Sequence, residues 1–113
     1  ENKMSKIDLT KLLSDMLNAA KGELGEKWPI AKDYAETEFK KIGEQILLIE
    51  KRKLTGEITE EEAKLLLHMQ ANASKAVLLA IEGIGLLTAE AAINAVLKVI
   101  KDAVNAAIGM AVI

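Results

Sequence analysis

Apolar residues recur three and four positions apart along most of the chain, the spacing at which side chains share one face of an α-helix. Near the N-terminus this stripe consists of Leu9, Leu12, Leu13, Met16, Leu17, Ala20 and Leu24. We predict a first helix over about residues 6–22, beginning after Ser5 with Asp8 at capping-box spacing. Gly22 and Gly25 are expected to end it.

A second helix is predicted over about residues 29–54. Proline is well placed in a first helical turn, and Pro29 stands where the periodic pattern resumes. The pair Thr55-Gly56 supplies a left-handed stop. The apolar stripe between these signals contains Ala31, Ala35, Phe39, Ile42, Ile46 and Ile49.

The start of a third helix has the clearest local signal in the chain. Thr59 stands at the N-cap position, and Glu62 stands three residues later, where its side chain can complete a capping box. Ile58 and Ala63 are spaced as a hydrophobic staple. We therefore predict that a helix begins at about residue 60.

The course of the chain beyond this point is open between two models. A hairpin at residues 83–88 would separate helices over about 60–82 and 88–111, with Thr88 as a lone N-cap candidate. Alternatively, one helix of about 54 residues, kinked at most at Gly83–Gly85, would span roughly 80 Å. The continuous helix is favoured, because a hairpin would expose the apolar pair Leu86-Leu87 in its turn.

Polar residues form one narrow stripe along this half of the chain and also favour a continuous helix. Several of them, with Gly83, fall at eleven-residue intervals, which suit a nearly straight helix. Almost every other position is apolar, and charge is sparse after residue 75. The stripe consists of Glu61, Lys64, His68, Asn72, Lys75, Glu82, Glu90, Asn94, Lys98, Lys101 and Asn105.

Composition supports an all-α fold and excludes several function classes. Hydrophobic residues make up 50% of the 113 positions, but only Trp28, Tyr34 and Phe39 are aromatic, and Pro29 is the one proline. A net charge of −2 argues against binding nucleic acid, and Lys51-Arg52-Lys53 is better explained by the negative end of a helix dipole. The chain has no cysteine, and no secretory signal is recognisable, so we expect a cytoplasmic protein.

No group of residues predicts catalysis, a metal site or a cofactor. His68 is the only histidine, and no glutamate precedes it by three residues as in di-iron helical proteins. The acidic residues near Asp33 and Glu60 suit solvated faces and a helix start, and no base is placed to activate Ser14 or Ser74. Gly83-Ile84-Gly85 lacks the third glycine of a dinucleotide loop. We therefore expect a non-enzymatic protein.

The sequence leaves two other binding functions open: association with a membrane and binding of a hydrophobic small molecule. The apolar stretch 77–97 is long enough to enter a membrane, but Glu82 and Glu90 interrupt it, so a membrane-associating or pore-forming helix is not favoured. A hydrophobic small molecule could bind between helices, with Met16, Met69 and Met110 as candidate lining residues.

The sequence predicts one helical domain over residues 1–113, a bundle of three to four helices whose long, very apolar C-terminal helix is completed by oligomerisation. Only two amphipathic helices are available to cover that apolar surface, so a homodimer is favoured and the expected role is structural or in protein interaction. Small side chains let helices approach closely. The expected oligomer interface consists of Ala76, Ala80, Gly83, Leu87, Ala92, Val96, Leu97, Ile100, Val104 and Ile108.

Overall fold

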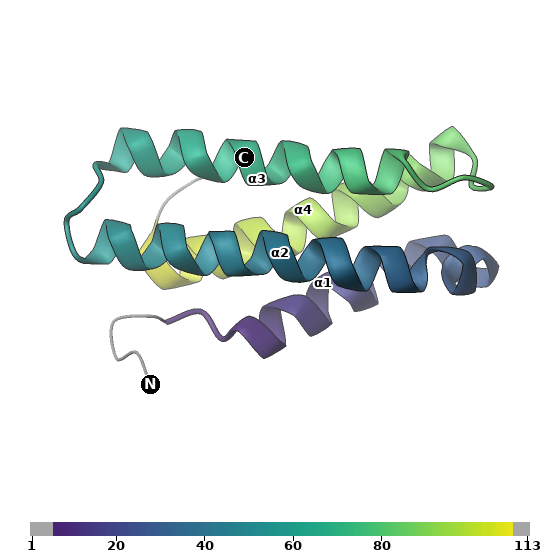
Figure 1. Cartoon of the computed structure of the whole chain (residues 1–113), viewed down its shortest axis with the longest axis horizontal. Helices are drawn as coiled ribbons and strands as arrows, with labels where there is room; N and C mark the ends of the chain where they lie inside the picture. The colour runs from purple at the N-terminus through teal and green to yellow at the C-terminus, as the bar shows by residue number, and fades with distance from the viewer. Residues whose placement is uncertain (1–5, 110–113) are drawn as a thin grey trace.

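The fold is given by a computed structural model that describes residues 6–109 (Figure 1). This range contains no strand, and the all-α prediction is confirmed. A short 3₁₀ turn, Gly25–Lys27, joins the first two helices. The α-helices of the described range are α1 (Leu9–Leu24), α2 (Trp28–Leu54), α3 (Glu60–Leu79) and α4 (Leu86–Ile108).

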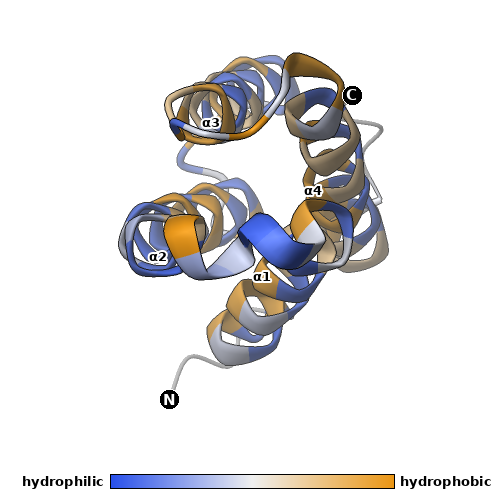
Figure 2. Ribbon diagram, turned by 90° about the vertical axis from the view of Figure 1, so that its right-hand side faces the viewer, coloured by the Kyte–Doolittle hydropathy of each residue, from blue (hydrophilic) through white to orange (hydrophobic). Residues whose placement is uncertain are grey.

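The helices pack side by side, each antiparallel to the one before it in sequence, within principal extents of 43 × 27 × 18 Å (Figure 1). Viewed end on, they occupy the corners of a four-sided arrangement in the order α1, α2, α3, α4 (Figure 2). The α1 and α4 helices make the most extensive contact, whereas α1 and α3 lie diagonally opposite, with no pair of Cα atoms within 8 Å. The first and last helices of the chain are therefore neighbours.

The apolar stripes predicted from the sequence meet in one core. Phe39, Met16 and Ile46 are fully buried there, together with Ile100 and Val96 of α4. The opposite face of α4 carries the polar stripe, whose members Glu90, Asn94, Lys98, Lys101 and Asn105 are all exposed. The division of α4 into an apolar and a solvated face is thus as its periodicity predicts.

The predicted start of α3 is confirmed in detail. The Thr59 hydroxyl accepts a hydrogen bond from the Glu62 backbone N–H at 3.1 Å, and the Thr59 N–H donates to the Glu62 carboxylate at 2.8 Å. The predicted stop of α2 is also present, because Gly56 has a φ of +79°. Lys51, Arg52 and Lys53 occupy the last turn of α2, as the helix-dipole interpretation requires.

The start of α1 differs from the prediction. The helix begins at Leu9, and Asp8 is its N-cap, with a side chain that accepts a hydrogen bond from the Lys11 N–H. The prediction of Asp8 as an internal member of a capping box is therefore wrong; Ser5 lies outside the described residues. An aspartate carboxylate is itself a preferred N-cap, so Asp8 satisfies the first turn directly. At the other end, Gly22 lies inside the helix and Gly25 is the C-cap.

The favoured continuous or merely kinked helix over residues 60–111 is wrong. The α3 helix ends at Leu79, and α4 begins at Leu86 and runs back along the molecule (Figure 1). Gly83 has a φ of +88°, a conformation that favours glycine, and Gly85 is the N-cap of α4. Thr88, the N-cap candidate, lies within α4.

The energy of burial explains why the chain reverses. Folding back places Ile93, Val96, Leu97, Ile100 and Val104 in the core of the same chain. Burying one such side chain is worth roughly 1.5–3 kcal/mol. At the start of α4, Leu86 is 66% exposed and Leu87 is 82% exposed, the exposure that the hairpin model requires. The free energy gained by burying the α4 face is larger than the free energy lost by leaving these two leucines exposed. Their exposure therefore does not prevent the hairpin.

Candidate functional site

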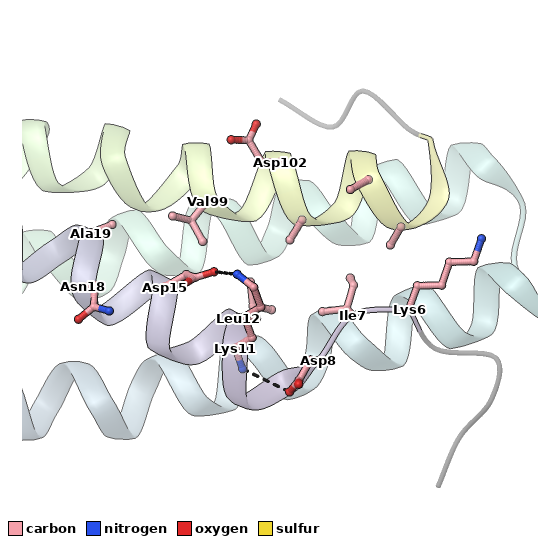
Figure 3. Close-up of a pocket in the computed structure, with 13 residues that line it drawn as sticks. Lys6, Ile7, Asp8, Lys11, Leu12, Asp15, Asn18, Ala19, Val99 and Asp102 are labelled. Carbon is pink, nitrogen blue, oxygen red and sulfur yellow. Dashed lines mark hydrogen bonds and ion pairs between the residues drawn. The ribbon is translucent and has the colours of Figure 1, made fainter.

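A groove between α1 and α4 has a cavity volume of about 710 Å³ (Figure 3). Sites for small molecules usually have volumes of roughly 300–1,000 Å³. The floor is apolar, because α1 contributes Leu12 and α4 contributes the small side chains Ala103 and Ala107, which leave space between the helices. The remaining lining residues are Lys6, Ile7, Asp8, Lys11, Asp15, Asn18, Ala19, Val99, Asp102 and Ala106.

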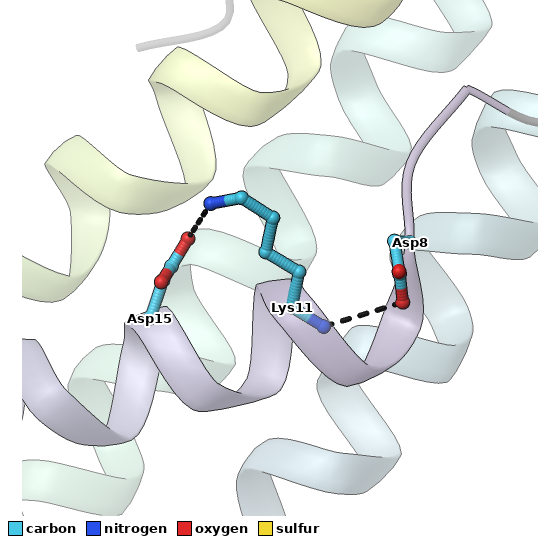
Figure 4. A network of polar contacts seen from close by, with 3 residues as sticks. All are labelled: Asp8, Lys11 and Asp15. Atoms are coloured by element: carbon cyan, nitrogen blue, oxygen red, sulfur yellow. Dashed lines mark hydrogen bonds and ion pairs between the residues drawn. The ribbon is translucent and has the colours of Figure 1, made fainter.

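The charged rim of this groove is largely neutralised by pairs within the same helix. The Lys11 Nζ lies 2.7 Å from the Asp15 carboxylate one turn later (Figure 4). On α4, the Lys98 Nζ lies 2.7 Å from the Asp102 carboxylate. Asp8 accepts a hydrogen bond from the Lys11 backbone N–H at 3.3 Å. The rim therefore offers little net charge to a ligand.

The Lys11 ammonium is held in its charged form. The hydrogen bond that the Lys11 ammonium donates to the Asp15 carboxylate, and the negative charge of that carboxylate, raise the pKa of Lys11 above its ordinary value, and the Asp8 charge adds to the effect. A lysine with a raised pKa is a poor general base at neutral pH, because its amine is almost wholly protonated. Lys11 is therefore not poised to act as a general base in this groove.

The residues considered as candidates for catalysis lie on α1 and α3. His68 and Glu61 are exposed on α3, and Ser14 is exposed on α1. Ser74 is buried, and its hydroxyl donates to the Gln70 carbonyl at 3.1 Å, as an ordinary helix-interior serine does. Among the residues that the structure describes, no group of three His, Cys, Asp or Glu side chains is placed to hold a metal ion.

The methionines predicted to line a ligand site do not lie together. Met16 is in the core, and Met69 is 55% exposed on α3. Neither lines the groove, and Met110 lies outside the described residues. The groove was missed from the sequence because its floor consists of alanines, whose small size matters only once the opposing helix is known.

The predicted interface residues fall into two groups. Ala92, Val96, Leu97, Ile100 and Val104 lie in the core of their own chain, and Ile108 is half-buried. A second copy cannot reach the core residues while the chain keeps this fold. The exposed group is Ala76, Ala80, Gly83 and Leu87, from α3, the turn that follows it and the first turn of α4.

Ala76 and Ala80 belong to a larger apolar surface on α3, on the side that faces away from the core. Leu65 is 65% exposed and Met69 is 55% exposed, which is unusual for large apolar side chains on adjacent turns. Ala73, half-buried, and Ala76 and Ala80, both exposed, continue the same helical face. We call Leu65, Met69, Ala73, Ala76 and Ala80 the α3 outer face.

A hollow of about 530 Å³ borders the C-terminal part of this face. Its walls are Tyr34, Glu38 and Lys41 of α2, and its α3 side includes Ala73, Ala76 and Ala80. The α3 outer face thus has large, protruding side chains toward one end and a hollow beside small side chains toward the other.

Glu50 is a buried carboxylate that the sequence analysis did not single out. It is 1% exposed near the end of α2 and accepts a hydrogen bond from the Lys6 backbone N–H at 2.8 Å. This contact ties the segment before α1 to α2. In the sequence, Glu50 stands directly before a basic cluster and is indistinguishable from a surface residue.

None of the helices in the described range is both apolar enough and long enough to cross a bilayer. No protein-family model, curated protein or solved structure matches this chain.

Proposed function

We propose that this protein is a non-enzymatic helical interaction protein that forms a homodimer through the α3 outer face. The observation that carries the proposal is the exposure of Leu65 and Met69 on one face of α3. Contiguous exposed apolar surface on a helical protein is typical of contact sites between proteins. The apolar α4 helix, which first suggested an oligomer, no longer supports one, because the other helices of the same chain cover it.

The proposal predicts that Met69→Glu converts a dimer into a folded monomer. A carboxylate at this position stays hydrated in the monomer but would be buried in the dimer, at a penalty of several kcal/mol. We expect the dissociation constant to rise about 100-fold or more, which corresponds to roughly 2.7 kcal/mol. Sedimentation equilibrium at micromolar concentration measures the change, and far-UV circular dichroism reports whether the helices are retained.

Asn94→Glu is the matched control, because Asn94 is exposed on α4, away from the α3 outer face. This variant is expected to keep the dimer. A monomeric wild-type chain under the same conditions would refute the proposal. Equal dissociation by both variants would show that added negative charge acts on the dimer from a distance.

Binding of a small apolar molecule in the α1–α4 groove is a second candidate function. Its support is the volume of about 710 Å³ over a floor that includes Leu12, Ala103 and Ala107. Ala103→Leu would fill part of that floor and is expected to weaken binding of anilinonaphthalene sulfonate about tenfold, or roughly 1.4 kcal/mol. Asn94→Leu adds the same side chain on α4 outside the groove, so probe fluorescence with this variant should match wild type. Equal titration curves for all three proteins would exclude the groove as the probe site.

A further inference from the structure

We infer that Glu50 is a positioning residue for the α1–α4 groove, because its buried carboxylate holds residues 6–8 in place as one end of that groove. This inference rests on the proposed binding function of the groove and specifies what keeps the groove in shape. Glu50 belongs to α2 and is not one of the residues that line the groove. Its effect on binding therefore passes through the segment that it holds.

Residues 6–8 form the end of the groove beside the last turns of α4 (Figure 3). Lys6, Ile7 and Asp8 all line it, and none of the three is helical, so helix hydrogen bonds do not fix their course. Asp8 caps α1, which fixes one end of the segment. Ile7 is 8% exposed and belongs to the core. The backbone at Lys6 needs a further contact to complete this wall.

Glu50 supplies that contact from a distant part of the chain. Its carboxylate is 1% exposed and accepts a hydrogen bond from the Lys6 backbone N–H at 2.8 Å. Hydrogen bonds to an ionised acceptor are stronger than those between neutral groups. An apolar side chain of similar size would fill the same space without the cost of removing a charge from water. A carboxylate at this buried position is therefore explained by its contact with the segment before α1.

Glu50→Met separates the positioning role from simple filling of space. Methionine is unbranched and fills irregular gaps, but its sulfur is only a weak acceptor. Replacing a buried charge with an apolar residue of similar volume is often neutral for stability, so we expect the helices to be retained. The dissociation constant of anilinonaphthalene sulfonate should rise about tenfold, because residues 6–8 no longer hold the end of the groove. Glu50→Gln keeps an acceptor oxygen and should stay within about threefold of wild type.

Two further variants show what a change in probe binding means. Leu78→Val is the control for stability, because Leu78 is 0% exposed on α3, diagonally opposite α1. It should lower the urea midpoint and leave the dissociation constant unchanged. Equal weakening by Leu78→Val and Glu50→Met would overturn the positioning role. So would weakening by Ala103→Leu without weakening by Glu50→Met, an outcome that leaves binding in the groove intact. No effect of Ala103→Leu would instead refute the groove as the probe site.

Hydrogen exchange followed by NMR tests the contact itself, starting with the wild-type protein. The Lys6 backbone N–H should exchange at least about tenfold more slowly than an unprotected amide. This protection should be lost in Glu50→Met and largely kept in Glu50→Gln, while the N–H of Met16, within α1, stays protected in all three proteins. A wild-type Lys6 N–H that exchanges like an unstructured peptide would overturn the inference, even if Glu50→Met failed to fold.

Discussion

Ile100→Glu is expected to unfold the protein at room temperature. Ile100 is 0% exposed in α4, where the helix lies against the rest of the core. A glutamate there would lose the packing of the isoleucine and bring an unpaired carboxylate into an apolar environment, at a penalty of several kcal/mol. Small proteins have total stabilities of about 5–15 kcal/mol, so this one change removes most or all of it.

Far-UV circular dichroism measures the outcome as loss of the helical signal, and urea titration measures any residual stability. Lys101→Glu is the matched control, because Lys101 is the next residue on α4 and is exposed. Its helical signal and unfolding midpoint should stay close to those of the wild type. A folded Ile100→Glu protein with an unchanged midpoint would show that the α4 face is not buried in solution.

Phe39→Ala is expected to lower the free energy of unfolding by about 3–5 kcal/mol. Phe39 is the largest fully buried side chain of the described residues, and it lies within α2. Truncation would remove a large apolar area and leave a cavity, since the surrounding helices can only partly collapse into it. The urea midpoint of the variant, compared at a constant slope, gives this difference directly.

Tyr34→Ala provides the comparison on the same helix. Tyr34 is 43% exposed, so its truncation removes much less buried surface. We expect a loss of about 1 kcal/mol or less for this exposed position. Similar losses for Phe39→Ala and Tyr34→Ala would mean that Phe39 is not at the centre of the core.

Local chemistry along the chain correctly predicts much of the secondary structure. The Thr59 and Glu62 capping box needs only four consecutive residues, and both of its hydrogen bonds are present. The limits of α2 follow from Pro29 and Gly56 in the same way. At the N-terminus, two capping signals compete within a few residues, and the side-chain contact of Asp8 with Lys11 shows which one starts α1.

The turn between α3 and α4 depends on long-range packing. Periodicity is compatible with a hairpin and with a straight helix, because the polar stripe keeps its helical spacing through both arms. Burial of Ile93, Val96 and Ile100 against helices formed earlier in the sequence favours the hairpin. Such burial cannot be read from a local window. The exposure of Leu86 and Leu87 costs less free energy than this burial gains, so it does not favour the straight helix.

The candidate sites could be predicted from the sequence even less well than this turn. Alanines of α4 look like helix formers, yet Ala103 and Ala107 form the floor of the groove because α1 lies opposite them. Leu65 and Met69 look like core residues, yet both are more than half exposed on α3. Exposure depends on which helices become neighbours, and the residues of one helix do not specify its neighbours.

The sequence by itself determined that this protein is all-helical, where α2 and α3 begin, and which face of α4 is solvated. These properties follow from backbone capping and from side-chain spacing within one helix. The tertiary structure alone decided that the chain reverses after α3, that α4 is covered by its own chain, and that the exposed apolar surface lies on α3. The reason is that the free energy of burial is shared among helices distant in sequence, whereas capping and periodicity act within a few turns.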